Sequence, residues 1–559
     1  MVKSLTRRKI QMTEGIDLTL FSVMTAIFIV ITLLLGWYGY KNTSDNQDFL
    51  LGRNKASPLV IALSYGATFL SASAVIGFGG QSAVHGMSLM WLCFLNLFLG
   101  LAVAFLIFGK RTRRIGRKLG AATFADLLGK IYQSKGIRTF TAILILVMMP
   151  VYAAAVLKGG VNSLAVITGL TNYYNIILIG LSLVVGIYVV YGGIIAVMYN
   201  DALQASIMFI GMLVILIVTW AYTGGITEGN EQLVSLWDQR MGDISGLGVA
   251  QGFEGWTSMS EFGSREWLTV VTTFIMGVGI GALTQPQLVV RYMSAKNDRD
   301  LDKSLMIGSI FILVVVGAAY TIGPLTNIFF SENHEGMMAF EYMSSIGLGT
   351  DFIVPQFILE IFADMTFGDI FISLFLLSLI CASISTISAL MHTIGVAGGY
   401  DLFSVYRSKK TGKQTDSQSV NLNRAFIVIF MILVVVYCYM MPNDIIAKAT
   451  SIFMGVTAAA LLPAYFYSLY SKRPKKRAAV ASICVGTFTY MFIALFLNTG
   501  LSIFMPVCEW ITGSKVLFPD SIIANIDPLI IALPLSVLTL IVFALVQKKE
   551  PNIVCTNDS

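Results

Sequence analysis

About thirteen apolar runs, each long enough to cross a lipid bilayer, take up roughly half of this chain of 559 residues. The hydrocarbon core of a bilayer is about 30 Å thick, so a helix needs about 20 apolar residues to cross it. A soluble protein could not cover this much apolar surface, because only 12% of the residues are charged. Membrane β-strands are shorter and alternate apolar with polar residues, which excludes a barrel. The sequence predicts an all-α polytopic membrane protein with about 13 transmembrane helices.

The loops between these runs sort by charge. Two long loops, 224–265 and 330–365, carry many Asp and Glu, and the basic segments are 110–137, 292–302, 402–424, 471–477 and the tail after 547. Cytoplasmic loops carry an excess of Lys and Arg. We therefore expect a multi-pass protein of the plasma membrane with a cytoplasmic C-terminus. Thirteen spans then place the N-terminus outside, although residues 1–15 are basic.

Charge and motifs exclude several other classes. The net charge of +6 comes from loops between the spans, so it indicates membrane topology and gives no sign of nucleic-acid binding. The six cysteines and three histidines are scattered, and no spacing typical of a metal site is present. No HExxH, GxSxG or P-loop motif occurs, so we expect no enzyme. The expected partners are the bilayer and a small-molecule substrate, and no obligate protein partner is evident.

Two predicted spans are interrupted by small residues. The second contains SYGATFLSASAVIGFGG (64–80), and the seventh contains MGVGIGALTQPQ (276–287). Gly and Pro weaken helices, and the freed backbone groups must find partners inside the membrane. Close packing of helices is an alternative explanation for the small residues. The two spans are five helices apart, as in two inverted five-helix halves, and such paired interruptions indicate a binding site near the membrane midplane.

Four hydroxyls lie in the eight residues CASISTIS (381–388), within an otherwise apolar span. Ala382, Ser385 and Thr386 share one helix face. Hydroxyls in a membrane helix can bond the carbonyl four residues earlier, which explains one or two of them. Hard cations instead take several oxygen ligands. Hydroxyls and freed carbonyls carry no fixed charge, so this pattern favours Na⁺ over Mg²⁺ or Ca²⁺, with carbonyls supplied near Ala67 and Leu70.

Asp201 is the nearest acidic candidate for this site. It lies one or two turns into the sixth predicted span, where a carboxylate is expensive and usually functional. Asp201 could remain in the headgroup region, or it could hold a second cation with Ser385 and Ser388. Arg291, at the end of the seventh span, reads as a cytoplasmic anchor.

Four stretches together resemble the sodium/solute symporter family, whose members carry sugars, proline, pantothenate and short carboxylates. They are DFLLGRNKASP before the second span, YGGIIAVMYNDALQ, TQPQLVVRYMSAKN, and the helix ICASISTISALMHTIGVAGGYDLF. The resemblance covers roughly 45–475. It implies the LeuT-type fold and sodium-coupled uptake by alternating access. The implied divisions are 1–57 with a leading helix, repeats at 58–223 and 266–470, a loop at 224–265, and two trailing helices with a short tail in 471–559.

The resemblance also implies a sodium site. Its residues would be the carbonyls of Ala67, Leu70 and Ala382 and the hydroxyls of Ser385 and Thr386. A second site, present in some members, would use Ser385, Ser388 and Asp201. Its further serine is replaced by Ala389 here, so one Na⁺ per cycle is expected.

The substrate should lie between the two interrupted helices. The candidate lining residues are Ser71, Ser73, Gln81, Lys158 and Gln285. Lys158 would lie about 15 Å deep, where it could snorkel, pair with a carboxylate, or face a substrate carboxylate. The last role favours a small organic anion or an amino acid. Sugar carriers of the family have an acid–amide pair where this chain has Ser73-Ala74, which argues against a sugar. A transporter-like sensor and a proton-coupled carrier of the same fold are the alternatives.

Overall fold

The computed structural model describes residues 16–52, 56–363, 365–403, 416–441, 446–502 and 507–547. Within these ranges the chain is helical, and one isolated bridge joins Ala56 to Ala295. The basic segment 1–15 and the tail 548–559 lie outside the described residues.

Eleven helices in the described ranges are long and apolar enough to cross a membrane. Two of these contain more than one predicted span. Ser73–Leu119 joins the second half of the second predicted span to the third, and Thr171–Tyr222 holds two spans in succession. Counting these spans separately agrees with the thirteen predicted from the sequence.

The segment predicted as the first repeat begins with an interrupted helix and ends in a helical hairpin. Its elements are α4 (Pro58–Phe69), η2 (Ser73–Gly77), α5 (Phe78–His85), η3 (Gly86–Leu89), α6 (Met90–Leu95), η4 (Asn96–Gly109), α7 (Lys110–Leu119), α8 (Phe124–Ile131), α9 (Lys135–Ile167), η5 (Thr171–Tyr173) and α10 (Tyr174–Tyr222). The hairpin turns inside α10 at Gly193, which has φ 55° and ψ −150°. Only glycine adopts this conformation readily.

The segment predicted as the second repeat follows the same order. Its elements are α12 (Arg265–Trp267), η6 (Leu268–Gly277), α13 (Val278–Gly281), η7 (Ala282–Thr284), α14 (Pro286–Met293), α15 (Asp298–Asn333), α18 (Gly368–Val396), η9 (Ala397–Phe403), α20 (Asp416–Met440) and α21 (Ile446–Tyr470). Gln285 is extended and Pro286 starts α14, so this helix is also interrupted.

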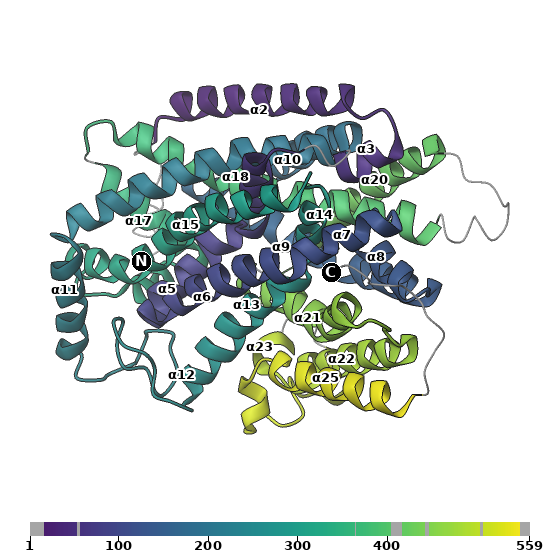
Figure 1. The fold of residues 1–559 in the computed structure, drawn as a ribbon. Helices are drawn as coiled ribbons and strands as arrows, with labels where there is room; N and C mark the ends of the chain where they lie inside the picture. The colour runs from purple at the N-terminus through teal and green to yellow at the C-terminus, as the bar shows by residue number, and fades with distance from the viewer. Residues whose placement is uncertain are drawn as a thin grey trace.

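Flanking helices lie on opposite edges of the bundle (Figure 1). On one edge α2 (Leu18–Lys41) packs on α10, and α3 (Asn46–Leu51) follows it. On the other edge α22 (Lys476–Phe496) and α25 (Leu529–Val546) pack on α21, with α23 (Thr499–Ser502), α24 (Val507–Thr512) and η10 (Ile522–Asn525) between them. Only 17% of the apolar stretch of α2 is buried, whereas 83% of the apolar stretch of α18 and η9 is buried. Hence α18 lies at the centre of the bundle and α2 at its surface.

The two long acidic loops contain short helices on one end of the bundle. They are α11 (Ile226–Gln239) in the first loop and α16 (Ala339–Ser345), η8 (Thr350–Phe352) and α17 (Ile353–Ala363) in the second. Trp256 anchors the first loop to the end of α5, since its indole Nε1 donates to Ala83 O at 3.0 Å and its carbonyl accepts the Met87 N–H. The loops therefore cover the end of the first interrupted helix.

Candidate functional site

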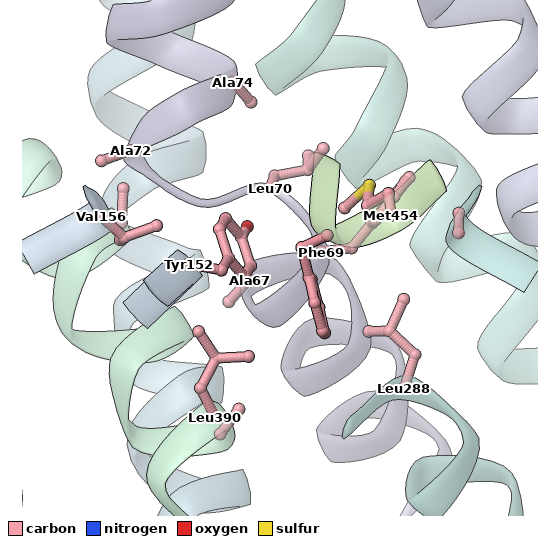
Figure 2. Packing of buried hydrophobic residues seen from close by; sticks show 14 of the residues in the cluster. Ala67, Phe69, Leu70, Ala72, Ala74, Tyr152, Val156, Leu288, Leu390 and Met454 are labelled. Atoms are coloured by element: carbon pink, nitrogen blue, oxygen red, sulfur yellow. The ribbon is translucent and has the colours of Figure 1, made fainter. Parts of the chain in front are cut away.

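The first interrupted helix breaks at Leu70 and Ser71. Leu70 has φ −94° and ψ 72°, which ends α4, and a π-helical turn begins at Ser73. Figure 2 shows the non-helical segment between Leu70 and Ala72, with the Tyr152 ring of α9 beside it. Small residues let neighbouring helices approach here, because a Cβ on Gly66 would lie 2.4 Å from Phe311 Cδ1. The break at Leu70 and Ser71 therefore frees backbone groups in the interior of the bundle.

The predicted sodium residues of α18 face this break. Ser385 Oγ donates to Ala67 O at 3.1 Å and to Ala382 O at 3.2 Å. Thr386 Oγ1 donates to Thr68 O at 3.4 Å. All five residues involved are buried. The structure therefore brings Ala67 of α4 together with Ala382, Ser385 and Thr386 of α18. Leu70 lies at the end of α4.

The second break lies at Gln285, against α21. Gln285 Nε2 donates to Gly281 O at 3.0 Å and to Thr457 Oγ1 at 2.9 Å. The side chain thus replaces part of the backbone bonding that the interruption removes. It also ties the interrupted helix to α21.

Asp201 is fully buried, so it does not face cytosolic water at the membrane surface. Its Oδ2 accepts Ser64 Oγ at 2.7 Å, Thr68 Oγ1 at 3.2 Å and Arg291 Nη2 at 3.1 Å. Arg291 is 0% exposed, and the interpretation of it as a surface anchor is wrong. Its guanidinium also donates to Ser64 and Thr68. This ion pair joins α10 and α14 to the helix that ends at the break.

A second polar group of atoms lies beside this pair. Asp201 Oδ1, Tyr188 Oη and both amide atoms of Gln204 have no hydrogen-bond partner within the described ranges. Tyr188 lies near Ser388, Gln204 and Asp201, without hydrogen-bond geometry to any of them. Ser388 Oγ donates to Ser385 O at 2.9 Å. The residues named for a second cation therefore share a buried polar region.

Ser71 and Ser73 belong to a hydroxyl cluster at the first break. Their Oγ atoms are hydrogen-bonded to each other. Tyr152 Oη donates to Ser71 Oγ at 3.2 Å, and Thr450 Oγ1 donates to Ser73 Oγ at 3.0 Å. The Phe453 ring stacks on Tyr152, with centroids 5.2 Å apart. Polar hydroxyls and aromatic faces from three helices thus meet at the break.

The other two predicted lining residues have different neighbours. Gln81 Nε2 donates to Thr350 Oγ1 at 3.1 Å, and its Oε1 is 3.1 Å from His85 Nε2, so it contacts the second long loop. Lys158 Nζ donates to Met441 O, just after the end of α20. No contact of Lys158 with the hydroxyl cluster is recorded among the described residues. Gln81 and Lys158 thus bond to other parts of the chain than the hydroxyl cluster of Ser71 and Ser73.

Sequence reasoning missed several residues of this region. Thr450, Phe453 and Thr457 recur on one face of α21 at intervals of three and four, a periodicity that could have identified them. Tyr152 stands alone in an apolar run, and Ser64 and Thr68 are ordinary hydroxyls of a membrane helix. No sequence signal distinguished those three.

Comparison with known proteins places these features in a family. A model of the sodium:solute symporter family matches residues 49–486. The osmoregulated proline transporter OpuE of Bacillus subtilis (strain 168) is 26% identical over 495 residues, which are 88% of this chain and 91% of the relative. The high-affinity proline transporter PutP of the same organism is 28% identical over 483 residues, 85% of this chain and 91% of the relative.

A solved structure shares the fold. It is described as the substrate-bound outward-open state of a Na⁺-coupled sialic acid symporter, and its TM-score is 0.73 at 16% identity, with 95% of this chain and 98% of that chain covered. The likeness confirms the LeuT-type arrangement predicted from the sequence.

Proposed function

The chain belongs to the sodium:solute symporter family, and we propose that it carries a zwitterionic amino acid of the proline type together with one Na⁺ bound between α4 and α18. The family and the relatives described above are transporters, and Na⁺ is the co-transported ion. The proposal therefore concerns the residues, the number of ions, the solute and the orientation in the membrane.

The contact of Ser385 and Thr386 with the end of α4 carries the sodium assignment. The two hydroxyls already bond the carbonyls of Ala67 and Thr68. A hydroxyl that rotates its hydrogen away presents an oxygen lone pair, and freed carbonyls do the same. Na⁺ would then be held by Ala67, Leu70, Ala382, Ser385 and Thr386. Bound there, it would fix α4 against α18 without any fixed negative charge.

The Arg291 pair supports a single Na⁺. Asp201 already has a cationic partner at 3.1 Å, with two hydroxyls on the same oxygen. A second Na⁺ beside Asp201 and Ser388 would have to enter next to the Arg291 guanidinium. Like charges in a buried region repel strongly. We propose that Arg291 takes the place of the optional second ion.

The hydroxyl cluster supports an amino acid rather than a simple anion. Ser71, Ser73, Tyr152 and Thr450 offer hydroxyl donors and acceptors, and Phe453 offers an apolar face. Lys158, the cation expected to pair with an anion, is bonded to Met441 O instead. Both B. subtilis relatives are named as proline transporters. A small zwitterion with an apolar ring fits this combination.

Coupling follows from the shared helix. The same break supplies carbonyls to Na⁺ and hydroxyls to the solute, so filling one site orders the chain that forms the other. By linkage, each ligand then raises the affinity for the other by the same factor. The long loops 224–265 and 330–365 would lie outside, with the C-terminus in the cytoplasm of a plasma-membrane protein.

Uptake of labelled L-proline into proteoliposomes tests the proposal. We expect wild-type uptake to depend on Na⁺ with a Hill coefficient near one, and Ser385→Ala and Thr386→Ala each to raise the half-saturating Na⁺ concentration by about tenfold, equivalent to about 1.4 kcal/mol. Ser383→Ala is the matched control. It is buried in the same helix against Gly160, away from these carbonyls, and should keep wild-type Na⁺ affinity.

Unchanged Na⁺ affinity in both Ser385→Ala and Thr386→Ala would remove the site assignment. Sodium-dependent uptake of another solute, with no response to proline, would instead remove only the solute. A Hill coefficient of two would show that Arg291 does not replace the second ion.

A further inference from the structure

Asp527 links the last helix to the second interrupted helix, away from the sites proposed above. It lies two residues before the start of α25 at Leu529, and its side chain is fully buried. Its Oδ1 accepts the Leu529 N–H at 2.8 Å. Its own N–H donates to Thr272 Oγ1 in η6 at 3.0 Å. Asp527 thus lies where α25 packs on η6.

The other carboxylate oxygen is unpaired. Asp527 Oδ2 has no hydrogen-bond partner in the part of the chain that the structure describes. It faces the end of η6, since a Cβ added to Gly277 would lie 3.3 Å from it. Among the described residues, the titratable group that interacts electrostatically with Asp527 is Tyr490 of α22. No cationic side chain among them forms an ion pair with Asp527.

The hydrogen bond from the first N–H of α25 explains only half of this carboxyl group. A helix N-terminus stabilises an anion, and Oδ1 accepts the expected backbone N–H. Oδ2 accepts nothing, and a buried charge without partners usually neutralises by taking up a proton. Burial raises the pKa of Asp527 to about 7. Both protonation states are therefore populated near neutral pH.

We propose that Asp527 is a proton-binding site that controls how tightly α25 packs against η6. With a proton on Oδ2 the carboxyl is neutral and can remain against Gly277. Without it, a buried anion faces an apolar helix surface, which favours separation of the two helices or entry of water. Because η6 is the first part of the helix that contains Gln285, the proton would bias one half of an interrupted transport helix. This holds whichever solute is carried.

The direction of the pH effect follows from linkage. The packed arrangement binds the proton more tightly than an arrangement in which Asp527 is hydrated and has an ordinary aspartate pKa. Packing is therefore fully favoured below that ordinary value and is lost as the pH rises through about 7. For a single proton the equilibrium changes by at most about tenfold per pH unit.

Infrared difference spectra of the purified protein in nanodiscs, between about pH 6 and about pH 8, test the proton directly. We expect the C=O band of a protonated carboxylic acid to disappear over this interval in the wild type. The band should be missing in Asp527→Asn and retained in the control Asp243→Asn, which changes an exposed carboxylate of the loop 224–265.

Hydrogen exchange of residues 268–277 tests the effect on the helix. After correction for the intrinsic rate, exchange should rise with pH in the wild type and stay flat in Asp527→Asn. A purely structural cap would instead shift exchange in Asp527→Asn equally at every pH. The proposal is overturned if Asp527→Asn shows the same acid band as the wild type and loses it over the same pH interval, or if hydrogen exchange has the same pH dependence in both proteins. Asp527→Glu keeps a carboxyl group at this position and should retain the band at a shifted frequency, which decides the first point if Asp527→Asn folds poorly.

Discussion

Arg291 shows how strongly the role of one side chain depends on its neighbours. Its position at the end of an apolar span is typical of a residue that anchors a helix in the headgroups. In the fold, α14 turns inward instead, and the guanidinium reaches Asp201, Ser64 and Thr68. A buried ion pair of this kind adds little net stability, but each partner prevents the other from being left as an unpaired charge.

Breaking this pair should be far more damaging than removing it. Asp201→Asn leaves the Arg291 charge buried and unpaired, which costs about 3–5 kcal/mol. The double variant Asp201→Asn with Arg291→Met has no buried charge, so we expect it to be clearly more stable than Asp201→Asn alone. Thermal unfolding of the three proteins in the same detergent measures this order.

An equal loss in the single and double variants would contradict this prediction. It would mean that the two residues stabilise the fold through separate contacts. The same proteins compared with and without NaCl test the single-ion proposal. Stabilisation by NaCl in the wild type alone would show that a cation binds near Asp201 and would contradict that proposal.

At the scale of helices, the turn inside α10 sets how two spans pack against α2. Gly193 has φ 55° and lies against Phe49, and a Cβ there would be 2.8 Å from Phe49 Cδ2 and 3.0 Å from Phe49 O. Gly192, beside it, would place a Cβ 2.9 Å from Gly36 O. Two adjacent glycines therefore allow α2, α3 and α10 to meet at one point.

Gly193→Ala should destabilise the protein by about 1–3 kcal/mol, because alanine is strained at this φ and has no space. Gly186→Ala is the matched control in the same helix. Nothing lies within 4 Å of its added Cβ, and its φ is not positive. We expect that variant to be neutral or up to about 1 kcal/mol more stable, since alanine favours the helix. Equal unfolding midpoints for the two variants would show that the turn tolerates a side chain.

At the scale of the whole molecule, the features that depend on the local sequence pattern could be predicted from the sequence. Hydropathy located the spans, and the spacing of Ser385 and Thr386 placed both on the face that meets α4. Contacts between distant segments could not be predicted. Lys158 bonds a carbonyl after α20, and Arg291 is buried, because tertiary packing decides where a long side chain ends. The unpaired oxygen of Asp527 likewise exists only where α25 meets η6.

The fold also fixes which chain segments share a side of the membrane. The Asp17 N–H donates to Asp369 Oδ1 at 3.3 Å, so α2 and α18 start on the same side. The hairpin between α22 and α25 lies on that side too. The Asp527 N–H donates to Thr272 of η6, and the loop before η6 is joined to the loop before α18 by the Arg240–Glu341 ion pair. Loop charges then predict that this side is outside. We expect a cysteine at Leu18 to react with a membrane-impermeant maleimide in intact cells, in a background without native cysteines.

Two further cysteines give this experiment its reference points. Ser514→Cys lies on the exposed hairpin between α22 and α25, and Lys472→Cys lies on the exposed turn between α21 and α22. Leu18→Cys and Ser514→Cys should label before lysis, and Lys472→Cys only after it. Labelling of Lys472→Cys alone in intact cells would invert the whole orientation. Labelling of Leu18→Cys and Ser514→Cys from opposite sides would contradict the placement of the α2 start and the α22–α25 hairpin on one side of the membrane.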